Sequence, residues 1–456
     1  MNVLLEDIEG LITYNNLNNL LNYKKITMDS RCVEKNDVFV AIKGNRLNGN
    51  DFAVDALERG ASFVILDDRD AYRKVNGAKI LVEDSLRALK SIGKQKLKQY
   101  KGKIIAITGS AGKTTTKELL SLILGVKYRV YKSYKNYNNL LGTYLNAANL
   151  DIESDFAIFE IATNSFGEIE QLSNYIRPDL AIITNIGFSH IGNFKNEDLL
   201  AREKLSIAKP DSVKTLWTEY NLYKRYRELI NKDLSIFTFT NNYKDNAYIR
   251  LLDYYIKENH ISYLVNISDY TFDFSLRHIY KQFVFDSLAP IGIAFNNQIN
   301  KKDINNALSC FKALDGRGDI IKSGGIKIID DTYNASFDSI VTSIDSLDEI
   351  ENVNKIFVLG EMAEIDGYED CLYNRLYEIV KNKKNISFVL VGNNYLKFRD
   401  LINVQYCDEK NRAISKVEGL LTHTKTTYIV IKASRRESFD TLIGPLKSLG
   451  EKVNVV

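Results

Sequence analysis

The sequence has few cysteines, and their spacing suggests no shared structural role. Four occur among the 456 residues: Cys32, Cys310, Cys371 and Cys407. Their wide separation excludes the closely spaced pairs of a zinc cluster and argues against a disulfide framework. We therefore interpret them as isolated, reduced thiols, which is the usual state of cysteines in the cytoplasm.

Long apolar runs and an excess of charge of one sign are also absent. No apolar stretch approaches the roughly 20 residues that cross a bilayer, and Glu6 and Asp7 stand where a secretory signal would carry positive charge. The 61 Lys and Arg residues nearly balance the 58 Asp and Glu residues, which gives a net charge of +3. An extended electrostatic interface with nucleic acid or an acidic membrane is therefore not expected. These features favour a cytoplasmic protein without membrane insertion.

What is present is an ordinary globular composition, 45% hydrophobic and 26% charged, with short apolar runs between longer mixed segments. This alternation is typical of an α/β fold. Strands are expected at residues 37–41, 62–66, 79–82, 104–108, 156–160, 180–185, 326–331, 356–360, 387–392 and 427–432. Lys113–Leu124 has apolar residues at helical spacing before Gly125, which predicts a helix. The stretch 212–300 is rich in Tyr and Asn and gives only weak strand signals.

Length and two changes in pattern predict three domains. A working size of about 100–200 residues per domain accommodates three in this chain. A lysine-rich stretch at residues 94–103 precedes a strand, and a Gly-Arg-Gly turn at residues 316–318 follows a helical pattern at residues 302–314. We therefore predict domains at residues 1–100, 101–314 and 315–456.

The strongest local signal is an apolar strand that leads through a glycine-bearing loop into a helix, at residues 104–116. Gly109 and Gly112 let the backbone bend so that N–H groups point at an anion, and the following helix adds its positive end. The spacing Gly-x-x-Gly-Lys-Thr is two residues shorter than the general P-loop pattern, yet it predicts a site for the phosphates of ATP or GTP. The residues of this site are Gly109, Ser110, Ala111, Gly112, Lys113, Thr114 and Thr115.

Two further polar residues follow predicted strands. Glu160 ends the strand at residues 156–160, and His190 follows the strand at residues 180–185. Ligands of open α/β sheets bind outside the carboxyl ends of the strands, so both side chains are expected beside the phosphate loop. A carboxylate and an imidazole there are candidate Mg²⁺ ligands, together with a threonine hydroxyl of the loop. Lys204 lies on a predicted helix, and the local sequence by itself predicts that it is a surface charge.

Together these features resemble the Mur ligase family, and within it the MurF type. The similarity extends over nearly the whole chain. It includes Thr-Met-Asp-Ser-Arg at residues 27–31, Asn-Tyr-Asn-Asn-Leu-Leu-Gly at 136–142, Asp-Asp-Thr-Tyr-Asn-Ala-Ser-Phe-Asp at 330–338 and Ile-Lys-Ala-Ser-Arg at 431–435. The Asp-Asn-Pro-Arg motif of the diaminopimelate-adding type is absent, and Tyr333-Asn334 favours the MurF type.

The resemblance implies an α/β fold of three domains, with a central P-loop domain and a Rossmann-like C-terminal domain. In chain order, the domains would bind the UDP-substrate, ATP and the incoming dipeptide. The implied activity is that of an ATP-dependent, ADP-forming amide ligase that adds D-alanyl-D-alanine to UDP-N-acetylmuramoyl-tripeptide through an acyl phosphate. This reaction belongs to peptidoglycan precursor synthesis for the cell wall. The partners would be these small molecules alone, with Mg²⁺ as cofactor and the protein a monomer.

The family pattern also implies roles for individual residues. The catalytic set would be Lys113, Glu160, His190, Lys204 and Arg317. The Mg²⁺ ligands would be Thr114, Thr115, Glu160, His190 and Lys204, the last as a carbamate, which turns a cation into an oxygen ligand. Arg317 and Asp331 would bind ATP, and Ser30, Arg31, Asn138 and Asn139 would bind the UDP-substrate. Contacts with the dipeptide would come from Tyr333, Asn334, Lys432, Ser434 and Arg435.

Some positions depart from the family pattern. Gln282 and Asp286 stand where the family has His and Asn on the nucleotide side, residues 218–221 replace its Asn-x-Asp-Asp, and Gly192 replaces a Glu. Two alternatives therefore stay open. The chain could join another amino acid or dipeptide to a UDP-sugar peptide, or it could be a non-catalytic, nucleotide-binding relative.

Overall fold

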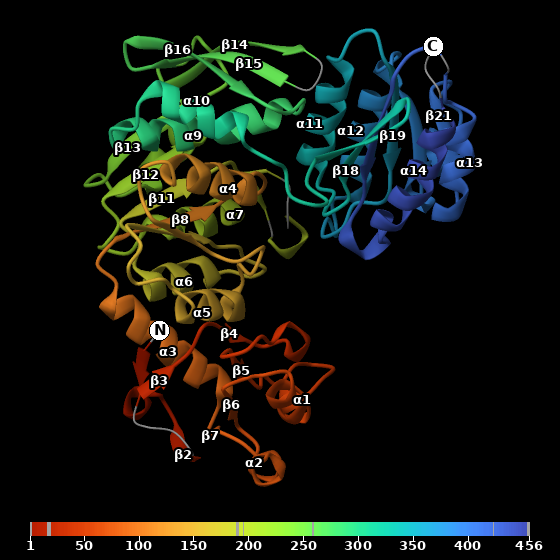
Figure 1. Ribbon diagram of the computed structural model, residues 1–456. Helices are drawn as coiled ribbons and strands as arrows, with labels where there is room; N and C mark the ends of the chain where they lie inside the picture. Colours follow the sequence, from red (N-terminus) through yellow and green to blue (C-terminus); the bar gives the residue numbers. More distant parts are fainter. Residues whose placement is uncertain are drawn as a thin grey trace.

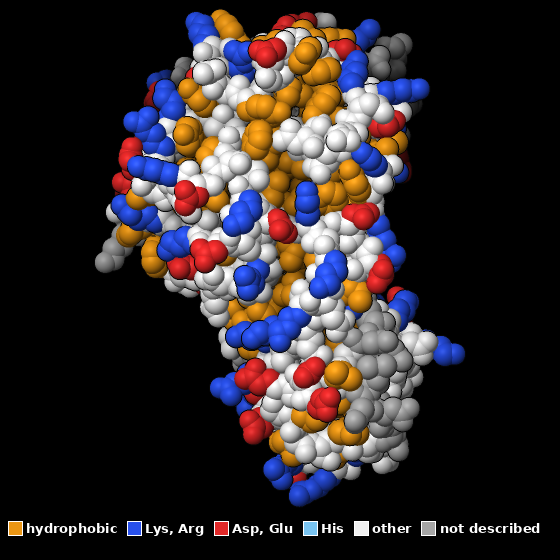
Figure 2. All heavy atoms as spheres, turned by 90° about the vertical axis from the view of Figure 1, so that its left-hand side faces the viewer, with side chains coloured by type: hydrophobic (Ala, Val, Ile, Leu, Met, Phe, Trp, Pro, Cys, Tyr) orange, Lys and Arg blue, Asp and Glu red, His pale blue; other side chains and the backbone are white. Residues whose placement is uncertain are grey.

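The computed structural model describes residues 2–15, 20–187, 191–194, 196–257, 260–422 and 424–453. They form three α/β units in chain order, each built around one main sheet (Figure 1). The α/β class and the three-domain architecture predicted from the sequence are confirmed. In the described part of the chain, no helix has the length and apolar character needed to cross a membrane. Positive and negative side chains are interspersed over the face shown in Figure 2, in keeping with the near-neutral net charge.

The N-terminal unit has a five-stranded sheet of order β2-β7-β6-β5-β4, in which only β2 runs antiparallel to its neighbour. These strands are β2 (Leu11–Asn15), β4 (Ile26–Thr27), β5 (Val38–Val40), β6 (Phe63–Leu66) and β7 (Lys79–Val82). A separate antiparallel pair joins β1 (Asn2–Leu4) to β3 (Leu20–Asn22). The helices are α1 (Ala53–Glu58), α2 (Arg69–Lys74) and α3 (Ser85–Gln99).

Helix α3 connects this unit to the central one and packs on α5 (Leu140–Ala148) (Figure 1). The approach is close because α3 has Gly93 at the contact: a Cβ there would lie 2.9 Å from the Cβ of Ala147. Tyr144 and Leu145 of α5 belong to the same buried cluster as Leu89 and Ile92 of α3. The N-terminal core is therefore closed by a helix of the central unit.

The central unit has a nine-stranded sheet of order β16-β15-β14-β13-β12-β11-β8-β10-β9, parallel from β9 to β14 and antiparallel beyond. Its strands are β8 (Lys103–Thr108), β9 (Val130–Lys132), β10 (Phe156–Glu160), β11 (Leu180–Ile183), β12 (Thr215–Glu219), β13 (Ser235–Thr240), β14 (Ile249–Lys257), β15 (His260–Ile267) and β16 (Tyr270–Leu276). Its helices are α4 (Lys113–Leu124), α5, α6 (Glu168–Ile176), α7 (Glu197–Leu205), α8 (Tyr220–Tyr226), α9 (Lys281–Asn296) and α10 (Lys301–Ser309). Side chains of β8 alternate between two cores: Ile105 and Ile107 face α4 and α9, whereas Ile104 and Ala106 face α6.

Two predicted ends in this unit are wrong. The strand expected at residues 180–185 stops at Ile183, because Thr184 and Asn185 turn toward the phosphate loop instead of continuing the sheet. The helix expected at residues 302–314 ends at Ser309. The chain from there to β17 (Asp319–Ser323) is an irregular link to the third unit.

The sequence pattern did not reveal α9, which lies in the weak stretch at residues 212–300. Helix α9 is buried nearly all round between α4 and strands β13–β15, so it lacks the one-sided apolar periodicity that identifies a surface helix. Pro290 lies inside it and cannot donate to the carbonyl of Asp286 four residues earlier. The hydroxyl of Thr116 on α4 donates to that carbonyl instead, at 3.4 Å.

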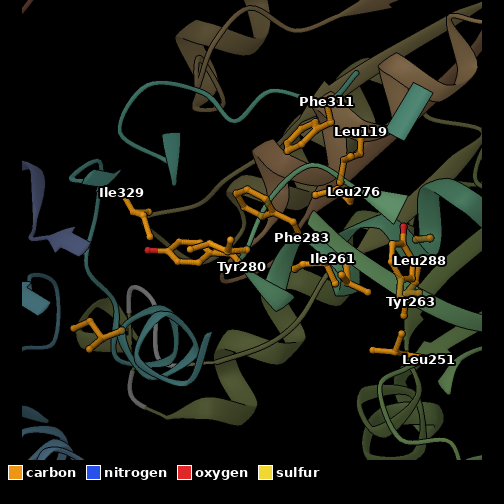
Figure 3. Close-up of a cluster of buried hydrophobic side chains, with 14 of the residues drawn as sticks. Leu119, Leu251, Ile261, Tyr263, Leu276, Tyr280, Phe283, Leu288, Phe311 and Ile329 are labelled. Atoms are coloured by element: carbon orange, nitrogen blue, oxygen red, sulfur yellow. The ribbon is translucent and has the colours of Figure 1, made fainter. Parts of the chain in front are cut away.

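The C-terminal unit has a six-stranded sheet of order β17-β18-β22-β19-β20-β21, parallel except for β17. Its strands are β17 (Asp319–Ser323), β18 (Ile326–Asp331), β19 (Asn354–Leu359), β20 (Ser387–Val391), β21 (Val404–Cys407) and β22 (Thr427–Lys432). Its main helices are α11 (Phe337–Asp348), α12 (Glu369–Asn382), α13 (Ala413–Glu418) and α14 (Ile443–Lys452). Figure 3 shows Tyr280 and Phe283 between Ile329 of β18 and central core residues such as Phe311, so one buried cluster spans both units.

Candidate active site

The phosphate loop leaves the carboxyl end of β8 and enters α4. Gly109 has φ 149° and Gly112 has φ 78°, a region that favours glycine. A Cβ at Gly109 would lie 1.9 Å from Thr184 Oγ1, and one at Gly112 would lie 2.4 Å from Asp286 Oδ1. Both glycines of the motif are therefore required by backbone conformation and by close neighbours.

A residue outside the predicted set holds this loop in place. The backbone N–H groups of Ser110 and Ala111 donate to Asn185 Oδ1 at 3.1 and 2.9 Å. The hydroxyl of Ser110 also accepts from the backbone N–H of Gly187 at 2.9 Å. The position of Asn185, directly after an apolar strand that neighbours β8, is a signal that could have identified it.

Two lysines meet at the first glycine of the loop. The ammonium groups of Lys113 and Lys204 donate to the carbonyl of Gly109 at 2.7 and 3.1 Å. Burial lowers the pKa of Lys113. Burial, followed by the charge of Lys113, holds the pKa of Lys204 well below its usual value. Lys204, which the sequence alone suggested as a surface charge, is only 1% exposed.

Glu160 at the end of β10 is buried and held from two sides. The side-chain amide of Asn138 donates to Oε1 at 2.7 Å, and the ammonium of Lys117 lies 3.4 Å from Oε2. Among the described residues, the buried hydroxyl of Thr114 has no hydrogen-bond partner, and Glu160 Oε2 accepts no hydrogen bond but is paired with the Lys117 ammonium. A buried hydroxyl without a partner is costly, and oxygen is the ligand that Mg²⁺ prefers. The arrangement therefore fits a hard cation beside the phosphate loop.

The full predicted metal set is not seen. His190 lies outside the described residues. Within the described ranges, no group of three or more His, Cys, Asp or Glu side chains is placed to hold a metal ion. Thr114, Thr115 and Glu160 line one cavity, whereas Lys204 lies behind the loop against Gly109.

This cavity, of about 520 Å³, lies between the central and C-terminal units. Its lining includes most of the predicted site residues: Ser110, Ala111, Gly112, Lys113, Thr114, Thr115, Asn138, Asn139, Glu160, Arg317, Asp331, Tyr333, Asn334, Lys432, Ser434 and Arg435. The structure thus brings the phosphate loop and the C-terminal motif residues to one place. Asn139 also caps α5, because its side chain accepts from the backbone N–H of Gly142 at 2.9 Å.

On the C-terminal side, three contacts among five of the predicted residues shape the cavity wall. The guanidinium of Arg317 lies 3.8 Å from the ring centroid of Tyr333, and that of Arg435 lies 5.3 Å from it. The ammonium of Lys432 donates to Asp331 Oδ2 at 2.6 Å. Burial raises the pKa of Asp331, and Lys432 opposes that rise. Arg317 and Asp331, predicted to bind ATP, are thus each in contact with a residue predicted to bind the dipeptide, Tyr333 and Lys432 respectively.

The two residues of the N-terminal unit that were predicted to bind the UDP-substrate lie apart from this cavity. Ser30 and Arg31 form a short helical turn in the N-terminal unit and do not line it. The guanidinium of Arg31 is mostly exposed and pairs with Asp29 at 2.8 Å.

The departures from the family pattern have structural counterparts. Gln282 donates to Asp286 Oδ1 at 2.8 Å beneath Gly112, and burial raises the pKa of Asp286 to about 7. A Cβ at Gly192 would lie 2.7 Å from the backbone nitrogen of Asp366 in the C-terminal unit. A side chain at position 192 would therefore push the two units apart there.

The fold and the site define a multidomain α/β protein of the P-loop class. Residues 107–294 match the Mur ligase middle domain, and residues 22–97 match the catalytic domain of the Mur ligase family. The UDP-N-acetylmuramoyl-tripeptide–D-alanyl-D-alanine ligase of Rickettsia prowazekii is 30% identical over 449 residues, which cover 94% of this chain and 96% of that protein. The enzyme of the same name from Bacillus subtilis is 29% identical over 431 residues, 92% of each chain.

Solved structures agree on the fold. MurF from Acinetobacter baumannii superposes with a TM-score of 0.83 at 24% identity and covers 95% of this chain and 94% of its own. The MurF ligase of Thermotoga maritima in complex with ADP gives a TM-score of 0.81 at 24% identity, with 94% and 98% covered. The chain belongs to the Mur ligase family.

Proposed function

We propose that this chain is an ATP-dependent, ADP-forming amide ligase that adds D-alanyl-D-alanine to UDP-N-acetylmuramoyl-tripeptide. The observation that carries the proposal is the cavity in which the phosphate loop, Glu160 and the Arg317–Tyr333 pair face one another between two units. The relatives with this activity in their names match over nearly their whole length. The reaction serves peptidoglycan precursor synthesis in the cytoplasm, with the chain acting as a monomer.

The three units take one substrate each. Residues 1–100 bind the UDP-substrate, residues 101–314 bind ATP, and residues 315–456 bind the incoming dipeptide. Ser30 and Arg31 lie in the N-terminal unit outside the cavity, so a UDP-substrate bound there would extend its peptide end toward the cavity. Asn138 and Asn139 then meet its peptide end, since they line the cavity on that side.

ATP binds with its phosphates at the loop of residues 109–115. Lys113 donates to the loop carbonyls in the structure, and its ammonium turns to the β- and γ-phosphates when they are present. Arg317, fixed by the ring of Tyr333, approaches from the opposite wall. Asp331 meets the nucleotide from the same wall. Placed cations of this kind offset the charge that develops on a transferring phosphoryl group.

Thr114 or Thr115 and Glu160 would hold one Mg²⁺, and His190 and Lys204 would hold a second, as the family pattern implies. The ions would supply charge neutralisation at the phosphates. Lys204 would serve as an oxygen ligand after carbamoylation. Its buried amine favours the neutral form, which attacks the carbon of CO₂, forms an N–C bond and releases one proton.

The amide bond forms in two steps. The acceptor carboxylate attacks the γ-phosphorus, ADP leaves, and an acyl phosphate results. The free amine of the dipeptide then attacks the carbonyl carbon, and phosphate leaves. Tyr333, Asn334, Lys432, Ser434 and Arg435 position the dipeptide for this attack. The contribution of the protein is chiefly orientation and charge neutralisation.

The test is phosphate release by the purified chain with Mg-ATP, UDP-N-acetylmuramoyl-tripeptide and D-alanyl-D-alanine. Release that requires all three substrates is expected, and Lys113→Ala should abolish it while the chain stays folded. A panel of other amino acids and dipeptides in the same assay tests the alternative substrate. If no combination of UDP-muramoyl peptide and amine releases phosphate, the chain is not this ligase.

A further inference from the structure

Lys117 is a buried cation of the cavity region that the proposed chemistry does not use. It lies on α4 one turn after Lys113, and its side chain is 0% exposed. Its ammonium lies 3.4 Å from Glu160 Oε2 and 3.8 Å from Glu118 Oε1, and it donates to the carbonyl of Lys135 at 2.5 Å. Removing an ammonium from water is expensive, so its retention here needs a compensating role.

The carbonyl that Lys117 binds belongs to an unusual backbone conformation. Lys135 has φ 48°, in the left-handed region that a non-glycine residue adopts only when its surroundings hold it. Three residues later, Asn138 returns to the site and donates to Glu160 Oε1. The segment 134–139 is therefore connected to Glu160 twice, once through Lys117 and once through Asn138.

Glu160 is held by two side chains that are both tied to the segment 134–139, an arrangement we call the clamp. Lys117 faces one carboxylate oxygen and Asn138 faces the other. Ser133 adds a third point, because its hydroxyl accepts from the backbone N–H of Glu160 at 3.1 Å. A displacement of the segment would move the carboxylate, and a displacement of the carboxylate would move the segment.

We propose that Lys117 is a positioning residue that couples the acceptor-side segment 134–139 to Glu160, so that binding of the UDP-substrate sets the carboxylate next to the ATP phosphates. The inference rests on the proposed function, in which Asn138 and Asn139 meet the acceptor and Glu160 holds Mg²⁺. Lys117 touches neither substrate. It acts through the Lys135 carbonyl and the Glu160 carboxylate.

The neighbouring ion pair supplies a matched control. Lys132 is 43% exposed, and its ion pair and side-chain hydrogen bond both join it to Glu118, not to Glu160 or the segment 134–139. Lys132→Met therefore removes a lysine of the same local charge cluster without breaking the clamp. Lys117→Met removes the buried ammonium and keeps a side chain of similar length.

The experiment measures phosphate release while the acceptor and ATP are varied separately. Lys117→Met should raise the KM for the acceptor about tenfold and lower kcat about ten- to a hundredfold, the range for loss of hydrogen bonds to a charged group. The KM for ATP should change less than about twofold, because the loop backbone that binds phosphate is untouched. Lys132→Met should match the wild type, and Lys117→Arg, which keeps the charge, should recover part of the loss.

A purely structural role predicts a different result. Lys117→Met would then lower the thermal midpoint and the active fraction, with both KM values unchanged and no gain from Lys117→Arg, and that outcome overturns the inference. A double-mutant cycle that combines Lys117→Met with Asn138→Ala adds a second criterion. The fold loss in kcat/KM for the acceptor in the double variant should be smaller than the product of the fold losses in the two single variants. Should Lys117→Met fail to fold, Lys117→Arg takes its place in the cycle, and full additivity overturns the coupling. If the wild type itself releases no phosphate, the proposed function has failed, not this inference alone.

Discussion

Asp286 is a buried carboxylate beneath the phosphate loop, and its ionisation should make the stability of the central unit depend on pH. It is 5% exposed, its carboxylate accepts a hydrogen bond from the Gln282 side-chain amide at 2.8 Å, and burial raises its pKa from 3.8 to about 7. The folded chain therefore keeps this proton between about pH 4 and pH 7, whereas the unfolded chain releases it. Because the folded state binds more protons in this window, the contribution of Asp286 to stability falls as pH rises.

The size of the effect follows from the shift. A difference of about three pKa units corresponds to roughly 4 kcal/mol, which is the cost of the ionised carboxylate once the pH exceeds both values. Asp286→Asn keeps the shape and the acceptor oxygen for Gln282 but cannot ionise. The stability of the variant relative to the wild type should therefore increase by roughly 3–4 kcal/mol between pH 4 and pH 8, with most of the change below pH 7.

Trp217 provides the assay. It is the only tryptophan of the chain, is 1% exposed, and packs against α9, the helix that carries Asp286: a Cβ at Gly292 would lie 2.4 Å from its ring. Urea unfolding followed by Trp217 fluorescence at a series of pH values reports the central unit of a chain whose three units need not unfold together. Asp269→Asn, at an exposed turn, is the control and should show no such trend. A constant difference between Asp286→Asn and the wild type from pH 4 to pH 8 would refute the reasoning.

Two further predictions concern the C-terminal wall of the cavity. Tyr333→Leu should raise the KM for ATP about three- to thirtyfold, because the Arg317 guanidinium loses the aromatic ring whose centroid lies 3.8 Å away. Tyr333→Phe keeps the ring, so its KM should stay near the wild-type value. Equal effects of the two changes would exclude a stacking role for Tyr333. Gly192→Glu should lower kcat and reduce the protection of the Asp366 region from hydrogen exchange, because a Cβ at position 192 would lie 2.7 Å from the Asp366 backbone. Gly444→Glu, at an open position, is the control. Normal protection in Gly192→Glu would show that the two units do not close on this contact.

The features that the sequence predicts well are those encoded within a few neighbouring residues. The phosphate loop depends on two glycines, a lysine and a helix start, and α4 has the predicted bounds Lys113–Leu124. Most expected strands are present because parallel strands buried on both faces read as continuous apolar runs. Glu160 was found for the same local reason, since it ends such a run.

What the sequence did not reveal depends on distant contacts. Asn185 binds loop amides 74 and 75 positions earlier in the chain. Lys117 has the spacing of an ordinary helix residue, and only the fold brings the Lys135 carbonyl and the Glu160 carboxylate to it. Lys204 was identified through the family resemblance alone, because its burial is a property of the packed fold and not of residues 199–207.

A near-neutral protein can bind polyanionic substrates when a few of its cations lie at the binding site. Lys113 and Lys117 of α4 and Lys432 of β22 lie at the carboxyl ends of two sheets. Lys117 and Lys432 are held by carboxylates, Glu160 and Asp331, whereas the ammonium of Lys113 donates to the carbonyls of Gly109 and Ser110. Lys113 is therefore the lysine of the three that a phosphate would supply with an anionic partner. Local placement, and not the total of +3, therefore gives this cavity its affinity for phosphate.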